Sequence, residues 1–145
     1  MTLKELTLRS FRNYEETVFN FSDKINVLYG NNGLGKTNIL EAIYMLGNGI
    51  SFRTRLDREI IKNGNDNYFI RGIFREDNLS YDTTIEITYQ KKSKKVFKKA
   101  FMDKKEVSSR KDLIGKILYI IFLPNDTDLV TGEPKLRRDY FNMLI

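Results

Sequence analysis

The chain has 145 residues, of which 41% are hydrophobic and 30% charged, and this composition excludes a disordered segment. It holds no cysteine and no histidine, which excludes disulfides, thiolate nucleophiles, Cys/His zinc sites and histidine bases. No apolar run approaches the ~20 residues of a membrane span. The N-terminus also lacks the apolar core of a signal peptide, so we expect a cytoplasmic protein without membrane contact.

Three strands are predicted before the first helix, at residues 3–8, 17–21 and 25–29. The third is an apolar run that ends in a glycine-rich loop. From Thr37 the apolar spacing becomes helical, with one face formed by Ile39, Leu40, Ile43 and Leu46. Gly47 and Gly49 are expected to end this helix.

The second half of the chain predicts a short helix at 57–62 and an antiparallel meander from roughly 68 to 107, with strands at 68–74, 83–89 and 96–102. A short helix is predicted at 108–114, and the apolar run 117–123 is typical of a buried strand. Residues 134–145 are expected to be helical, and their uncapped end suggests a cut from a longer protein. The prediction is one unit of α/β class with a mixed sheet.

The glycine-rich loop carries the strongest functional signal. Residues Gly30-Asn31-Asn32-Gly33-Leu34-Gly35-Lys36-Thr37 match the phosphate-binding pattern G-x-x-x-x-G-K-[ST] in full. Its backbone amides and the following helix N-terminus would face phosphates, Lys36 would neutralise them, and the Thr37 hydroxyl would hold Mg²⁺. The alternative is an ordinary glycine-rich turn, which the flanking strand and helix disfavour.

Several stretches resemble a known family. Ser10-Phe11-Arg12-Asn13-Tyr14, Ile25–Gly30 and Asn32–Ile43 resemble the N-terminal part of SMC-like ABC ATPases. Ser51-Phe52-Arg53-Thr54 and the run Phe122–Val130 are similar to the RecF family of bacterial DNA replication, repair and recombination proteins. Two departures stand out: Asn125 replaces the Glu of a Pro-Glu-Asp pattern, and Tyr140-Phe141-Asn142 replaces an ending Phe-Leu-Asp.

The resemblance implies a P-loop NTPase of the ABC/SMC-like type, with residues 1–145 as the N-terminal lobe of its head. The ABC signature, the Walker B strand and the catalytic carboxylate are not in this sequence, so we expect ATP binding without hydrolysis and assign no catalytic residue. In the family, ATP would clamp two heads together on DNA as a homodimer, with other recombination proteins as partners, in DNA repair, replication and the SOS response.

The resemblance also implies roles for single residues. Arg12 would reach the phosphates; a solvated strand-end arginine is the alternative. Nucleotide contacts are expected from Arg12, Gly30, Asn31, Asn32, Gly33, Leu34, Gly35, Lys36, Thr37 and Asn38. Thr37 and Asp126 would hold the metal, although residues 124–126 also suit a turn closed by side-chain-to-backbone bonds. Arg53, Arg55 and Arg58 could meet DNA or a partner subunit, or simply be solvated.

Residues 91–105 hold eight Lys and one Asp, so the chain's net charge of +6 is a local feature. We expect DNA-backbone binding there, by Lys91, Lys92, Lys94, Lys95, Lys98 and Lys99. The alternative is a set of lysines that guards a sheet edge. The spacing of Phe97 and Phe101 predicts that they face the core. Two other functions stay open, a small P-loop kinase and a relic P-loop fold used for protein contacts.

Overall fold

The computed structural model describes residues 1–76, 81–93, 95–123, 126, 131–135 and 137–138. The elements in these parts of the chain follow the order β1 (Thr2–Phe11), β2 (Tyr14–Asn20), α1 (Lys36–Asn48), η1 (Asp57–Glu59), β3 (Asn67–Arg75), β4 (Asp82–Lys92), β5 (Lys95–Met102), β6 (Lys105–Glu106) and η2 (Arg110–Asp112). Both η elements are 3-10 helices. The predicted α/β class is confirmed, with one α-helix and a single sheet in the described residues.

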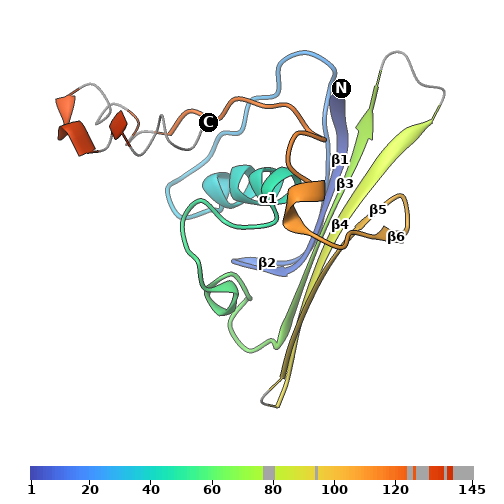
Figure 1. Cartoon of the computed structure of the whole chain (residues 1–145). Coiled ribbons are helices and arrows are strands. Elements are labelled where there is room, and N and C mark those ends of the chain that lie inside the picture. The colour runs from blue at the N-terminus through green and yellow to red at the C-terminus, as the bar shows by residue number, and fades with distance from the viewer. Residues whose placement is uncertain (77–80, 94, 124–125, 127–130, 136, 139–145) are drawn as a thin grey trace.

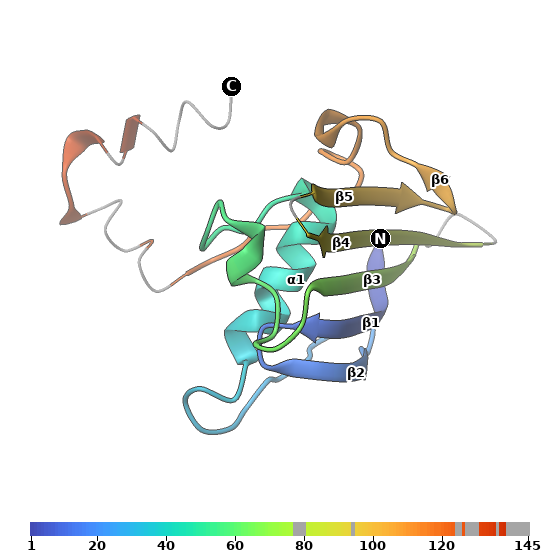
Figure 2. The same ribbon diagram turned by 90° about the horizontal axis from the view of Figure 1, so that it is seen from below.

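The sheet has six strands in the order β2-β1-β3-β4-β5-β6, and each pairing between these strands is antiparallel. The predicted meander is present as β3 to β6. Helix α1 lies across one face of the sheet (Figures 1 and 2). The opposite face of the sheet carries most of the charged side chains of β1, β3 and β4, such as Glu5, Arg71 and Glu86, so this antiparallel sheet is apolar on one side only.

The core forms between α1 and the sheet. Strand residues of alternating spacing point toward the helix and are buried, as are four helix residues; the set includes Leu6, Leu8, Ile70, Ile85, Ile87, Ile39, Ala42, Met45 and Leu46. The two layers approach closely at Gly72, where an added Cβ would lie 2.6 Å from Leu46 Cδ1. Burying each large aliphatic side chain contributes about 1.5–3 kcal/mol, so this interface anchors the start of α1 where the glycine-rich loop ends.

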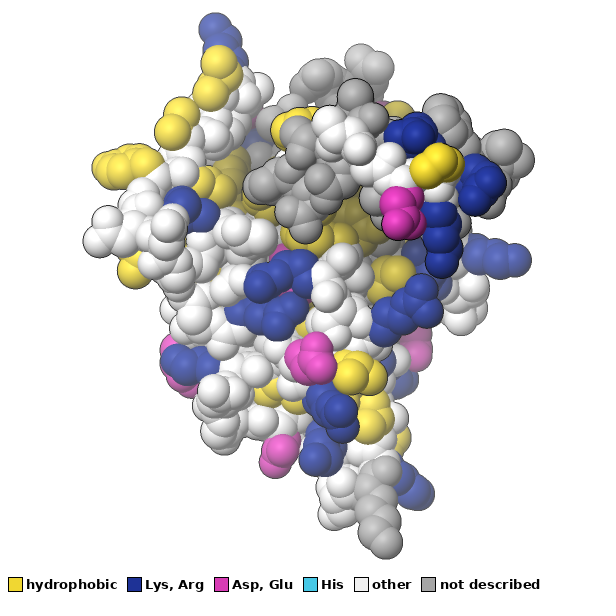
Figure 3. All heavy atoms as spheres, turned by 90° about the vertical axis from the view of Figure 1, so that its left-hand side faces the viewer, with side chains coloured by type: hydrophobic (Ala, Val, Ile, Leu, Met, Phe, Trp, Pro, Cys, Tyr) yellow, Lys and Arg dark blue, Asp and Glu magenta, His cyan; other side chains and the backbone are white. Residues whose placement is uncertain are grey.

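Two predicted strands are wrong for this structure. Residues 25–29 and 117–123 are described, yet neither segment has strand pairing. Most of their apolar side chains lie outside the core, since Ile25 is 84% exposed and Ile120 is 99% exposed, whereas Ile117 is only 8% exposed and belongs to the core. Figure 3, which views the molecule from the left-hand side of Figure 1, shows hydrophobic side chains gathered at the upper left. The expected mixed sheet is therefore replaced by an antiparallel one, because these segments have no neighbouring strand.

Smaller differences concern element ends and one strand face. Helix α1 continues through Gly47 and ends at Asn48, with Gly49 as its cap. Phe97 is 46% exposed and shares the outer face of β5 with Lys95 and Lys99, so its predicted core position is wrong. Phe101 lies on the same face. The predicted helix 134–145 falls largely outside the described residues, and no described helix is long and apolar enough to cross a membrane.

Candidate phosphate-binding site

The glycine-rich loop joins the extended segment 25–29 to α1. Gly30, Gly33 and Gly35 have φ values of 139°, 84° and 102°, which residues with a Cβ rarely adopt. Gly35 is the N-cap residue of α1 and has no side chain with which to cap the first-turn amides. The first turn also has no acidic residue. The positive end of the helix is thus left for an anion rather than for a capping side chain.

A pocket of about 340 Å³ opens over this loop, and its lining residues are Asn32, Gly33, Gly35, Lys36, Thr37, Asn38 and Arg53. The Lys36 ammonium donates 2.8 Å hydrogen bonds to the carbonyl oxygens of Gly30 and Asn31, which fold it back over the loop. Two cations and several amides around one pocket fit the phosphates of a nucleotide, because charge-assisted hydrogen bonds are the strongest that phosphate oxygens make.

Asn13 in the β1–β2 turn and Tyr14 at the start of β2 lie against the loop. Asn13 donates to the Leu34 carbonyl at 3.1 Å and accepts from Asn38 at 2.9 Å. A Cβ on Gly35 would lie 2.7 Å from the Asn13 side chain and 2.8 Å from the Tyr14 hydroxyl. Sequence reasoning assigned no role to these two residues, although they belong to the stretch Ser10–Tyr14 that carried the family resemblance.

Arg12 lies in the same turn and adopts a left-handed conformation, with φ at 55°. Its backbone N–H donates to the Ile60 carbonyl at 2.7 Å, which anchors the turn to the segment after η1. Its guanidinium is not a solvated strand end: it donates to both carboxylate oxygens of Glu41 and to the Glu59 carbonyl. An arginine held on three acceptors in a strained turn is a positioned group.

A second pocket of about 490 Å³ adjoins the first and is lined by Arg12, Asn13, Asn38, Arg53, Glu59, Ile61, Lys62 and Asn63. The two pockets share Asn38 and Arg53. We refer to them together as the nucleotide groove. The sequence left Arg53 open between a DNA or subunit contact and a solvated position; its guanidinium lies in this groove, where it donates to Asn38 at 2.7 Å and to Glu41 at 3.3 Å. Arg55 and Arg58 are exposed outside it.

Of the two predicted metal ligands, one lies at the phosphate pocket and the other does not. Thr37 borders the phosphate pocket. Asp126 does not line that pocket, and its carboxylate accepts a 2.6 Å hydrogen bond from the Leu123 backbone N–H. This bond matches the turn alternative. Asn125 lies outside the described residues, and the described residues contain no group of three or more acidic side chains that could hold a metal.

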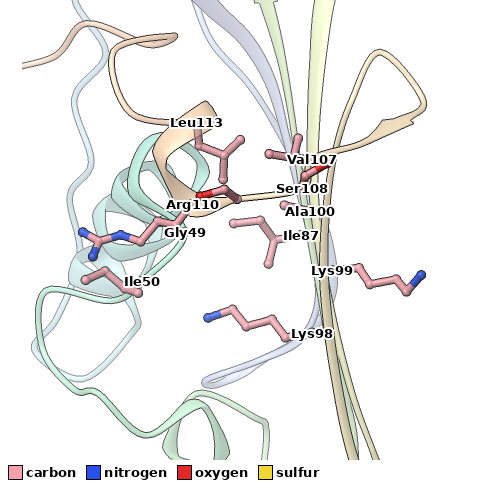
Figure 4. A pocket seen from close by; sticks show the side chains of 11 residues that line it. Gly49, Ile50, Ile87, Lys98, Lys99, Ala100, Val107, Ser108, Arg110 and Leu113 are labelled. Carbon is pink, nitrogen blue, oxygen red and sulfur yellow. The ribbon is translucent and has the colours of Figure 1, made fainter.

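The lysines of the β4–β5 hairpin separate into two groups. Lys98 pairs with Asp57 at 2.7 Å and Lys99 pairs with Glu106 at 2.9 Å. Figure 4 shows that they point to opposite sides of β5, Lys98 toward a pocket of about 320 Å³ beside η2. Lys91, Lys92 and Lys95, which we call the tip lysines, are exposed at the end of the hairpin. Lys94 lies between them, outside the described residues.

An uncapped helix after a glycine-rich loop that matches the phosphate-binding pattern, packed on a sheet, is typical of a P-loop NTPase, and the similar structures make it one of the ABC type. Residues 2–125 match the family model described as the RecF/RecN/SMC N terminal domain. The chain therefore belongs to the RecF/RecN/SMC N-terminal domain family.

Within this family the RecF proteins are close relatives. The chain is 39% identical over 145 residues to the DNA replication and repair protein RecF of Leptospira interrogans, covering 100% of this chain and 39% of that protein. A solved structure of the recombination mediator RecF with ATP superposes with a TM-score of 0.84 at 32% identity, over 96% of this chain and 36% of that one. A chain from an SMC ATPase structure shares the fold, with a TM-score of 0.79 at 20% identity and full coverage of both chains.

The comparisons also bear on the alternatives. The similar proteins are RecF and SMC proteins, so the small-kinase alternative is not supported. The chain spans about two fifths of the length of the RecF relative from Leptospira interrogans.

Proposed function

We propose that this chain binds ATP together with Mg²⁺ through residues 30–38 and the nucleotide groove, as the N-terminal lobe of a RecF-like ATPase head. The observation that carries the proposal is the uncapped start of α1, with three glycines at positive φ and the cations Lys36 and Arg53 around one pocket. Thr37 would hold Mg²⁺, which would supply further neutralisation of phosphate charge. The adjoining pocket beside Arg12 and residues 61–63 offers room for the rest of the nucleotide.

Calorimetric titration of the chain with ATP in the presence and absence of Mg²⁺ tests this assignment. Lys36→Ala removes one charge-assisted contact to phosphate, worth about 1.5–3 kcal/mol, and should weaken binding about tenfold or more. Thr37→Ala should reduce the gain in affinity that Mg²⁺ provides. Lys24→Ala, which removes an exposed lysine outside the groove, serves as the control. Equal affinity of the Lys36 variant and the control would refute the phosphate-loop assignment.

The lobe assignment rests on the unpaired apolar segments 25–29 and 117–123. Val27 is 74% exposed, Leu118 is 85% exposed, and neither segment has a neighbouring strand in the described residues. An apolar segment that pairs with no strand is a surface for strand addition. The proposed occupant is a second lobe of the head, which would complete the sheet and permit ATP-dependent dimerisation. ANS fluorescence should be high for the chain and should fall for Val27→Ser combined with Leu118→Ser.

We further propose that the tip lysines contact the DNA backbone. They are exposed and form no salt bridge with an acidic residue in the part of the chain that the structure describes, in contrast to Lys98 and Lys99, which pair with Asp57 and Glu106. Three neutralised phosphates give a slope of log K against log salt of about −2.7. Charge reversal of the tip lysines should flatten that slope, whereas reversal of Lys98 and Lys99 should change it much less. An unchanged slope in the first variant would place the DNA contact elsewhere, with Arg55 and Arg58 next in line.

The biological setting follows from the RecF likeness. A chain of this kind would act in recombinational DNA repair and replication, in the cytoplasm, with other recombination proteins as partners and as part of the SOS response. Co-purification with recombination mediators after DNA damage, compared with the Lys36→Ala variant, would test that setting.

A further inference from the structure

Glu41 is a fully buried carboxylate in the middle of the phosphate-loop helix. Its exposure is 0%, although an ionised carboxylate in a protein interior is costly unless it is paired. It lies four residues after Thr37, so it occupies the next turn of the same helix face. Each of its oxygens is satisfied, since it accepts from Arg12, Ser51 and Arg53.

Both arginines bonded to Glu41 line the nucleotide groove. Arg12 approaches it with two nitrogens, Nε at 2.9 Å and Nη2 at 2.5 Å, in the bidentate geometry that fixes a guanidinium plane. Arg53 approaches through Nη1, which it shares with Asn38. The Arg12 side chain is 16% exposed and the Arg53 side chain 43% exposed. The two arginines are far apart in sequence, on the β1–β2 turn and on the segment after α1.

The bonds continue beyond the carboxylate in both directions. Arg12 donates to the Glu59 carbonyl at one end of the groove. At the other end Arg53 donates to Asn38, Asn38 to Asn13, and Asn13 to the Leu34 carbonyl of the phosphate loop. Glu41 is the anionic centre of a connected network that spans both pockets of the groove.

We infer that Glu41 is a positioning residue for nucleotide binding: it holds Arg12 and Arg53 in the groove so that their remaining N–H donors face a polyanionic ligand. The inference rests on the proposed ATP binding. When a ligand orders a long arginine side chain, the lost conformational entropy costs about 0.5–1.5 kcal/mol of binding free energy. An arginine that a buried carboxylate already holds has lost this freedom before the ligand arrives.

This role has a consequence that distinguishes it from bulk electrostatics. Glu41 is a negative charge close to the phosphate pocket, so its neutralisation by charge alone would tighten the binding of ATP⁴⁻. Loss of positioning acts in the opposite direction. For two arginines the ordering cost of about 0.5–1.5 kcal/mol each predicts that Glu41→Gln weakens ATP binding about tenfold.

The experiment is calorimetric titration of the whole 145-residue chain with ATP and with inorganic tripolyphosphate, for wild type, Glu41→Gln and the double variant Arg12→Ala/Arg53→Ala. Glu16→Gln on β2 is the charge-matched control and should bind as wild type. Glu41→Gln should bind both ligands about tenfold more weakly. Added to the double variant, it should have less than about a twofold effect, because its action runs through the two arginines.

Each outcome decides a different question. If wild type does not bind ATP, the proposed function fails. If wild type binds and Glu41→Gln binds equally or more tightly, or weakens the double variant just as strongly, the positioning role is wrong while nucleotide binding stands. Should Glu41→Gln not fold, Ser51→Ala removes one bond to the carboxylate and should weaken ATP about twofold. In wild type, the Arg12 Nε–H proton should also exchange slowly with solvent by NMR, and fast exchange would overturn the inference.

Discussion

Because side chains pack behind the phosphate loop at Gly35 but not at Gly33, Gly35→Ala should lower the free energy of unfolding more than Gly33→Ala does. Both residues have positive φ, 102° and 84°, so alanine at either position pays the left-handed cost of about 1–2 kcal/mol. A Cβ at Gly33 meets nothing within 4 Å. A Cβ at Gly35 lies 2.7 Å from Asn13 Oδ1 and 2.8 Å from the Tyr14 hydroxyl, so these side chains must move.

Displacing Asn13 breaks its hydrogen bonds to Leu34 and Asn38. Each neutral hydrogen bond contributes about 0.5–1.5 kcal/mol, and exposed ones lie at the low end. Gly35→Ala should therefore cost about 2–4 kcal/mol of unfolding free energy, against about 1–2 kcal/mol for Gly33→Ala.

Urea unfolding followed by circular dichroism measures both variants, with equal slopes indicating that only stability has changed. Asn13→Ala removes the obstacle in advance, so Gly35→Ala should cost less in that background than in wild type. Equal losses for the two glycine variants, or full additivity with Asn13→Ala, would refute the claim that the β1–β2 turn packs against the loop.

Four further predictions concern the rest of the chain. The chain alone should release phosphate from ATP far more slowly than about 1 s⁻¹ in a phosphate-release assay, because no described carboxylate lines the pocket over the phosphate loop; turnover near that rate that Lys36→Ala abolishes would contradict this. Hydrogen bonding from Arg75 lowers the pKa of Asp82 below its ordinary value of 3.8, so the ion pair stabilises the fold above pH 3.8 and this contribution is lost as pH falls through the lower folded-state pKa. Asp82→Asn should accordingly be less stable than wild type at pH 7 and equal to it in strong acid, and a pH-independent difference in unfolding free energy would count against the pair. Tyr68 is buried, which raises its pKa, and its hydroxyl donates to Asp57 at 2.7 Å, so Tyr68→Phe should cost about 1 kcal/mol in urea unfolding. Ile120→Ser should change that free energy by less than about 0.5 kcal/mol because its side chain is 99% exposed, and a larger loss would mean that the side chain is packed.

Sequence reasoning was most successful where the signal is local. The loop Gly30–Thr37, the helix after it and the strands of the meander each follow from a short motif or a period of two or of 3.6 residues. The strands at 25–29 and 117–123 were wrong because an apolar run shows only that a segment suits burial. Whether it becomes a strand depends on a neighbour with free hydrogen-bonding groups, and no described strand lies beside either segment.

The phosphate loop could be predicted from the sequence alone, since the conformations of its glycines and the start of α1 depend on residues within one short stretch. The residues that surround this loop depend on how distant parts of the chain pack together. Arg12, Glu41 and Arg53 come from a strand turn, a helix and a loop, and no spacing rule joins them. They meet because the sheet and α1 pack around one core, and a buried carboxylate then requires cations beside it.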